Sequence, residues 1–243
     1  MTVFPRPEVK LRHTTISIPA ERVWLDGELS HAPTVRSLAV ILRPSGSMPT
    51  QSCETKVAAA LQDAGFATLI INLLTRYEET RDADTRFNVP KLANRILAVA
   101  DWISHQPPLT GLAIGLVASG TGSGAAIRAA WKTPGRFAAI VCRAGRPDLA
   151  GATPLGTLTV PVRMIIGSED PHLAMILRAW EHLRAPRDWK LVDGAGEDFV
   201  EPGALDRFAL LAAEWLRAQL PLPVADGVER SGQSDKPPSS HPL

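Results

Sequence analysis

The chain has 243 residues, of which 45% are hydrophobic and 21% are charged. This length and mixture predict one soluble α/β domain and argue against a disordered or membrane-spanning protein. The 26 Lys and Arg residues balance the 25 Asp and Glu residues, so the positive excess that attracts a phosphate backbone is absent and we expect no nucleic-acid partner.

The N-terminal segment lacks the apolar core of a signal peptide, and the longest apolar runs, at residues 38–42 and 69–71, have the length of strands. We therefore expect no signal peptide and no contact with a membrane. The two cysteines, Cys53 and Cys142, are too few for a disulfide framework or a structural zinc site. They fit a reducing, cytoplasmic location, with a disulfide between the two as the alternative. We expect no metal and no other cofactor.

Residues 14–30 form two short alternating runs with a break at 19–21, which is the pattern of an antiparallel hairpin. The apolar runs after this hairpin lack alternation, as is typical of parallel strands that helices cover on both faces. These runs lie at residues 37–42, 66–73, 112–118, 137–142 and 162–166.

Apolar residues at helical spacing fill the segments between the runs, at residues 53–64, 92–103, 121–131, 172–183 and 205–216. A hairpin followed by repeated strand–helix units predicts a doubly wound, mostly parallel sheet with an antiparallel start. We expect a single domain over residues 1–220. Residues 221–243, about half of which are Pro, Gly and Ser, predict a disordered tail.

A glycine-rich turn follows the buried run at 112–118 and opens the next helix. Such a turn suits a phosphate cradle or the strained elbow that presents a catalytic nucleophile. The segment lacks the Lys-Ser/Thr of a P-loop and the G-x-G-x-x-G spacing of a dinucleotide site. A structural interpretation also stands, in which the glycines let a helix pack close to a strand.

The turn Ala118-Ser119-Gly120-Thr121-Gly122 resembles the Gly-Ala-Ser-Thr-Gly elbow of the dienelactone-hydrolase-like branch of the α/β-hydrolase family. Further matches in register lie at residues 64–69, 145–151 and 201–205, and the resemblance runs from about residue 14 to about residue 220. It implies a three-layer α/β-hydrolase-type fold with a mostly parallel sheet.

The resemblance also implies where a catalytic triad would lie. The serine falls on Gly120, the histidine on Glu197 and the acid on Asp170, while the His-Gly pair near the oxyanion loop falls on Arg43-Pro44. Glycine has no nucleophile, a glutamate with a pKa of about 4 is a poor base at pH 7, and proline has no N–H to donate. Only the acid is retained.

Other residues near the elbow offer a different constellation. Ser119 precedes the elbow and is expected to point to the opposite face of the sheet, while Ser123 lies one turn into the helix. Cys142 is a stronger intrinsic nucleophile at the end of a strand, although a buried cysteine is more often inert packing. His172 is the best candidate for a catalytic base. A histidine at the start of a helix is, however, more often an ordinary surface residue.

Residues 75–88 form a charged segment that carries the only tyrosine, Tyr77. One interpretation is a mobile surface loop. The other is a lid over the strand ends, where loops commonly shape hydrolase pockets.

These observations favour a catalytically degenerate hydrolase-fold protein that binds a small molecule or a protein partner, with Arg43, Thr121 and Arg146 as candidate binding residues. The alternative is a working ester or lactone hydrolase that uses Ser119 or Cys142 with His172 and Asp170. A nucleotide-binding module is the third hypothesis.

The final expectation concerns Asp170 and Glu197, two carboxylates that the family register brings together. Such a pair favours a shared proton or an intervening cation. We expect Arg43 to form a salt bridge with one of them and to plug the former catalytic cleft. The alternative is that Glu197 turns outward into solvent.

Overall fold

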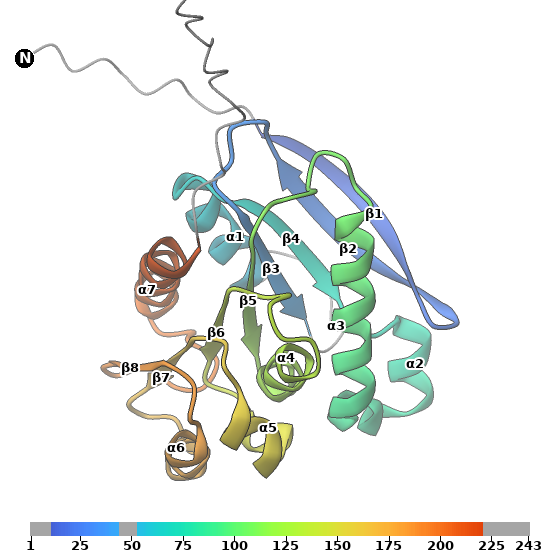
Figure 1. The fold of residues 1–243 in the computed structure, drawn as a ribbon. Coiled ribbons are helices and arrows are strands. Elements are labelled where there is room, and N and C mark those ends of the chain that lie inside the picture. The colour runs from blue at the N-terminus through green and yellow to red at the C-terminus, as the bar shows by residue number, and fades with distance from the viewer. Residues whose placement is uncertain (1–10, 44–52, 221–243) are drawn as a thin grey trace, which may run out of the picture.

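A computed structural model describes residues 11–43 and 53–220, which form one eight-stranded sheet in the order β1-β2-β4-β3-β5-β6-β7-β8 (Figure 1). β1 pairs with β2 and β2 with β4 in antiparallel fashion, and all the other pairs are parallel. The strands are β1 (Arg12–Ala20), β2 (Val23–His31), β3 (Leu38–Arg43), β4 (Ala67–Asn72), β5 (Ile114–Ser119), β6 (Ala139–Arg143), β7 (Val162–Gly167) and β8 (Arg187–Val192).

Helices cover both faces of the sheet, which gives the three expected layers. α1 packs against α7 on one face, and α3, α4, α5 and α6 follow one another on the other face (Figure 1). The α-helices are α1 (Cys53–Asp63), α2 (Arg76–Arg81), α3 (Val89–Ser104), α4 (Thr121–Lys132), α5 (Ala152–Thr157), α6 (Leu173–His182) and α7 (Ala204–Gln219), with short 3₁₀ turns at Ala83–Phe87 and Pro147–Ala150.

The central strands form the core, because both of their faces are covered. Every residue of β3 and β7 is buried. The hairpin strands β1 and β2 instead alternate between exposed and buried residues, as expected from their sequence. The turn between them lies at residues 21–22, two residues later than the break at Pro19 suggested, because Pro19 still pairs with Trp24 in the ladder.

The edge strand β8 was not expected, because its charged residues hide the usual strand pattern. Trp189 packs edge-to-face on Trp180 with ring centroids 5.3 Å apart, and Asp188 forms a 2.6 Å ion pair with Arg163 of β7. These side-chain contacts, which cannot be inferred from the local sequence, therefore hold β8 in place.

Residues 75–88, interpreted from the sequence as a mobile surface loop or a lid, form α2 and a 3₁₀ turn at the surface, and Glu78 anchors them to α3. Thr75 caps α2 in a reciprocal capping box with Glu78. The Glu78 carboxylate also accepts hydrogen bonds from both terminal nitrogens of Arg95 (2.8 and 2.5 Å) and from Lys91 (2.6 Å). Arg95, which is 1% exposed, donates to Leu73 O as well.

The predicted tail at 221–243 and the predicted role of Pro44 lie outside the described residues. Within the described parts of the chain, no helix is both long enough and apolar enough to cross a membrane.

Candidate functional site

Gly120 forms a sharp elbow between the end of β5 and the start of α4. Its φ of 52° and ψ of −135° are left-handed dihedrals of the kind that a strained nucleophile elbow needs. Gly145 lies against this turn, and a Cβ added there would be 2.6 Å from Gly120 O. The elbow geometry is therefore present, but no side chain projects from its apex.

The other glycines of the turn support close packing. A Cβ added at Gly124 would lie 2.7 Å from Arg146 O, so this residue lets α4 approach the 146–150 segment. Such contacts favour the structural interpretation of the glycine spacing over a dinucleotide site.

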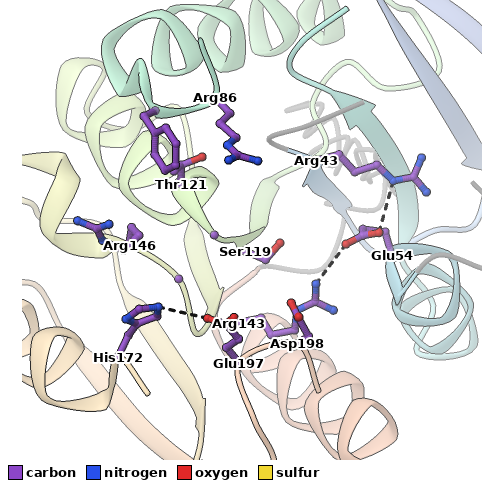
Figure 2. Close-up of a pocket in the computed structure, with 13 residues that line it drawn as sticks. Arg43, Glu54, Arg86, Ser119, Thr121, Arg143, Arg146, His172, Glu197 and Asp198 are labelled. Atoms are coloured by element: carbon purple, nitrogen blue, oxygen red, sulfur yellow. Dashed lines mark hydrogen bonds and ion pairs between the residues drawn. The ribbon is translucent and has the colours of Figure 1, made fainter. Parts of the chain in front are cut away.

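A cavity of about 670 Å³ lies over the C-terminal ends of the parallel strands, next to the elbow. This is where ligands bind in open α/β sheets. Four arginines line it: Arg43, Arg86, Arg143 and Arg146. Figure 2 shows that they come from different elements around the cavity. The three predicted binding residues, Arg43, Thr121 and Arg146, are all among the residues that line it.

Glu54, in the first turn of α1, joins two of these arginines. Its carboxylate lies 3.5 Å from Arg43 Nε and 3.2 Å from Arg143 Nη2 (Figure 2). The expected salt bridge from Arg43 to Asp170 or Glu197 is therefore wrong. β5 separates the strands that carry these two arginines, so their long side chains meet an acid from α1 before they reach the triad loops.

His172 is the group that lies between the two carboxylates. Its backbone N–H donates to Asp170 Oδ1 at 2.7 Å, and its ring Nε2 lies 3.4 Å from Glu197 Oε2. Asp170 is 5% exposed, and its Oδ2 has no hydrogen-bond partner among the described residues. The side chains of His172 and Glu197 are about half exposed. Asp170 therefore holds the backbone of His172, the residue just before α6, in place.

The loops that carry these groups are fastened together. Glu169 N donates to Ala195 O at 2.9 Å, and a Cβ added at Gly167 would lie only 2.1 Å from that same oxygen. Gly120 and Glu197, two of the positions that the family register named, line the same cavity as His172, while the third, Asp170, is buried and does not line it.

Cys142 does not suit a nucleophile. Its side chain is completely buried, and burial raises the pKa of its thiol to about 12, so the thiolate is not accessible at neutral pH. Ser123 is also fully buried, and its hydroxyl donates to Ala144 O. Both serve packing.

Ser119 lies closer to the cavity than expected. It lines the cavity, and together with Glu54 and Arg143 it also lines a small space beneath it. Ser119 therefore borders the cavity, although the small space that it also lines is bounded by Val57 of α1 and Phe208 of α7. No imidazole is hydrogen-bonded to its hydroxyl in the described structure, since the His172 ring contacts Glu197.

Several lining residues were not anticipated. Arg143 follows a buried run just as Arg43 does, and a charged residue at the end of a parallel strand was a usable signal. Arg86 and Phe87 come from the anchored 75–88 segment, which supports its interpretation as a lid. Glu54 gave no sequence signal, because an acid in the first turn of a helix is common.

Arg146 and Arg86 differ in their partners. Arg146 forms two hydrogen bonds to Asp148, at 3.0 and 2.9 Å, and these raise the pKa of its guanidinium group. Arg86 stacks on Phe87, 5.0 Å from the ring centroid, and no acid among the described residues pairs with it. The described residues contain no group of three or more His, Cys, Asp and Glu side chains able to hold a metal ion.

Comparison with known proteins places this geometry in a family. A dienelactone hydrolase from Anabaena variabilis is 36% identical, with a TM-score of 0.81 over 86% of this chain and 99% of that one. An alpha-beta serine hydrolase homologue from Coxiella burnetii shares the fold at 17% identity, with a TM-score of 0.68 over 84% of this chain and 97% of that one.

Among curated proteins, the chain matches two from Mycobacterium tuberculosis named "Putative phosphoribosyl transferase", at 36% identity over 206 residues. That match covers 84% of this chain and 46% of theirs, so the chain spans about half their length. No family model matches the chain. The elbow, the sheet order and the near-complete overlap with the Anabaena enzyme agree, and the chain belongs to the dienelactone hydrolase family of α/β-hydrolase-fold proteins.

Proposed function

We propose that this protein binds a small molecule in the cavity above Gly120 and does not hydrolyse esters through a catalytic triad. One observation carries the proposal: the elbow residue that faces the cavity is a glycine, with elbow dihedrals but no side chain. Without a nucleophile at the apex, a covalent acyl-enzyme intermediate cannot form there.

The neighbouring groups support the same conclusion. The Cys142 thiol is buried with a raised pKa, and Glu197 stands where the family has its histidine. The His172 ring contacts Glu197 and comes from the loop that carries the acid. Each of the three triad roles therefore lacks either its residue or its usual partner.

The cavity supports a small ligand over a protein partner, because a concave site of several hundred Å³ is typical of small-molecule binding. We infer a cytoplasmic location from the free thiols of Cys53 and Cys142. We assign the chain no phosphoribosyl transfer, since the region that it shares with the two longer Mycobacterium proteins has a hydrolase fold.

The test uses a fluorophosphonate probe for active serines and a panel of short-chain esters and lactones. We expect no labelling, and no ester turnover above that of the heat-denatured protein. A thermal-shift screen of small molecules should at the same time find ligands that stabilise the protein. Probe labelling with saturable ester turnover would refute the proposal.

The accessible Ser119 favours a second candidate, an ester or lactone hydrolase that uses this hydroxyl with His172 as base. Under this candidate, labelling and turnover disappear in Ser119→Ala and in His172→Gln, while Ser123→Ala, which changes a buried hydroxyl on the next helix, leaves both intact. Labelling that persists in Ser119→Ala excludes it.

A further inference from the structure

We propose that the ligand of this cavity carries a phosphate monoester group, which binds between Arg43 and Arg143 over Ser119, where the Glu54 carboxylate now lies. This inference rests on the proposed function and names the chemical class of its ligand.

The strand register brings the three side chains to one level of the sheet. β5 lies between β3 and β6, with Leu42 opposite Ala118 and Ser119 opposite Arg143. Arg43, the next residue of β3, therefore ends its strand beside Ser119. Two arginines thus end their strands on either side of Ser119, and all three residues line the cavity.

Both guanidinium groups are held away from bulk water. The Arg43 side chain is 9% exposed and the Arg143 side chain is 10% exposed, so their charges are weakly screened. α4, a helix of 12 residues, begins beside them without a side-chain cap. Its positive end adds to the field of the arginines at this edge of the cavity.

Glu54 occupies this position as an internal anion, and its carboxylate contacts both arginines. One carboxylate carries a single negative charge, whereas the two arginines carry two positive charges. Its contacts, at 3.2 and 3.5 Å, are longer than the 2.7–2.9 Å of a strong charged hydrogen bond. The carboxylate is therefore placed to be displaced by a better-matched anion.

The charge balance favours a phosphate monoester over a carboxylate ligand. A carboxylate ligand carries the same single charge as the Glu54 side chain that it would replace. Because Glu54 is attached to the chain, its carboxylate has the higher effective concentration at this position. A phosphate monoester carries nearly two negative charges at pH 7 and three terminal oxygens. The two charges and three terminal oxygens of a phosphate monoester match the two guanidinium groups and the Ser119 hydroxyl.

Phenyl phosphate is a suitable probe, because the exposed ring of Phe87 lines the same cavity and can contact its aryl group. Isothermal titration at pH 7.5 and constant ionic strength compares it with benzoate, which has the same ring and a carboxylate. We expect phenyl phosphate to bind at least 10-fold more tightly than benzoate.

Two substitutions should move the affinity in opposite directions. Arg143→Met removes a charged donor and should weaken phenyl phosphate binding about 10- to 100-fold, while Arg143→Lys should lose less. Glu54→Gln removes the competing carboxylate and should tighten binding. The matched control is Arg178→Met, which changes an exposed arginine of α6 outside the cavity and should change nothing. Thermal melts verify that each variant is folded.

Equal binding of benzoate and phenyl phosphate would overturn the inference, as would phosphate binding that Arg143→Met leaves unchanged. Failure of Glu54→Gln to bind millimolar phenyl phosphate overturns it as well, while ligands found by thermal shift would still support the proposed function. Release of phenol or turnover of esters would instead refute the non-hydrolytic function, and the Arg143 dependence of binding would still report on the phosphate subsite.

Discussion

Two glutamates in this protein each lie between two cations, yet their surroundings differ. Glu78 accepts hydrogen bonds of 2.5–2.8 Å from Arg95 and Lys91, and its carboxylate also bonds the backbone N–H of Thr75. Glu54 contacts its two arginines at 3.2 and 3.5 Å, on the wall of a cavity. The first arrangement holds a chain segment in place, and the second presents charge to a ligand.

The difference lies in which groups satisfy the carboxylate. Partial burial raises the pKa of Glu78, but the hydrogen bonds from Arg95, Lys91 and the Thr75 backbone outweigh it and hold that pKa well below the ordinary value of 4.5. Backbone contact makes the position of the chain depend on this charge. An ion cluster that joins a backbone group to a buried cation is therefore expected to be structural.

The largest expected effect comes from Arg95→Met. Arg95 is buried, and its loss removes two hydrogen bonds to the Glu78 carboxylate and one to Leu73 O, so we expect a loss of about 3 kcal/mol in the free energy of unfolding. Urea denaturation measures this value. The control is Lys91→Met, which removes a more exposed cation and should cost less than about 1 kcal/mol. Equal losses would show that Glu78 is not held chiefly by Arg95.

Measuring the stability of the Glu78→Gln variant over a range of pH tests the same comparison between Glu78 and Glu54. Because the folded-state pKa of Glu78 lies below its unfolded value, ionised Glu78 stabilises the protein above pH 4.5, and this contribution falls as the pH drops below 4.5. We expect the variant to be less stable by about 2 kcal/mol at pH 7, with the gap narrowing toward pH 3 in urea melts. The control Glu181→Gln changes an exposed glutamate of α6. A gap that does not depend on pH would contradict the prediction.

The smallest expected effect on stability comes from Glu54→Gln. Its ion pairs are long and involve only side chains, so the free energy of unfolding should fall by about 1 kcal/mol, less than for Glu78→Gln. The measurement is again urea denaturation at pH 7. A loss as large as that of Glu78→Gln would break the comparison, because Glu54 would then be a structural anchor as well.

The sequence predicted most of the fold because the relevant signals are local. The apolar runs that become β3 to β7 indicate buried parallel strands, and this prediction does not require knowing which strands they pair with. β8 was missed because an edge strand needs no continuous apolar run, and its stability comes from contacts such as that of Asp188 with Arg163.

The site was predictable only in part. The family register predicted triad positions at Gly120, Asp170 and Glu197. The predicted partner of Arg43 was wrong, because the choice between acids depends on side-chain reach in three dimensions. Arg143 and Glu54 are 89 positions apart in the chain, and neither local sequence indicates that the two side chains are in contact.

The orphaned oxygen of Asp170 has a consequence for the ancestry and redesign of the protein. One carboxylate oxygen accepts a hydrogen bond from the backbone N–H of His172, and the other is buried without a hydrogen-bond partner among the described residues, on a loop tied to the 194–197 segment. An imidazole at position 197 would bring an N–H donor to that segment, and the backbone of Gly120 already has the dihedrals of an elbow. Under the predicted family register, Gly120→Ser and Glu197→His would place a serine and a histidine at the triad positions beside the buried Asp170 carboxylate.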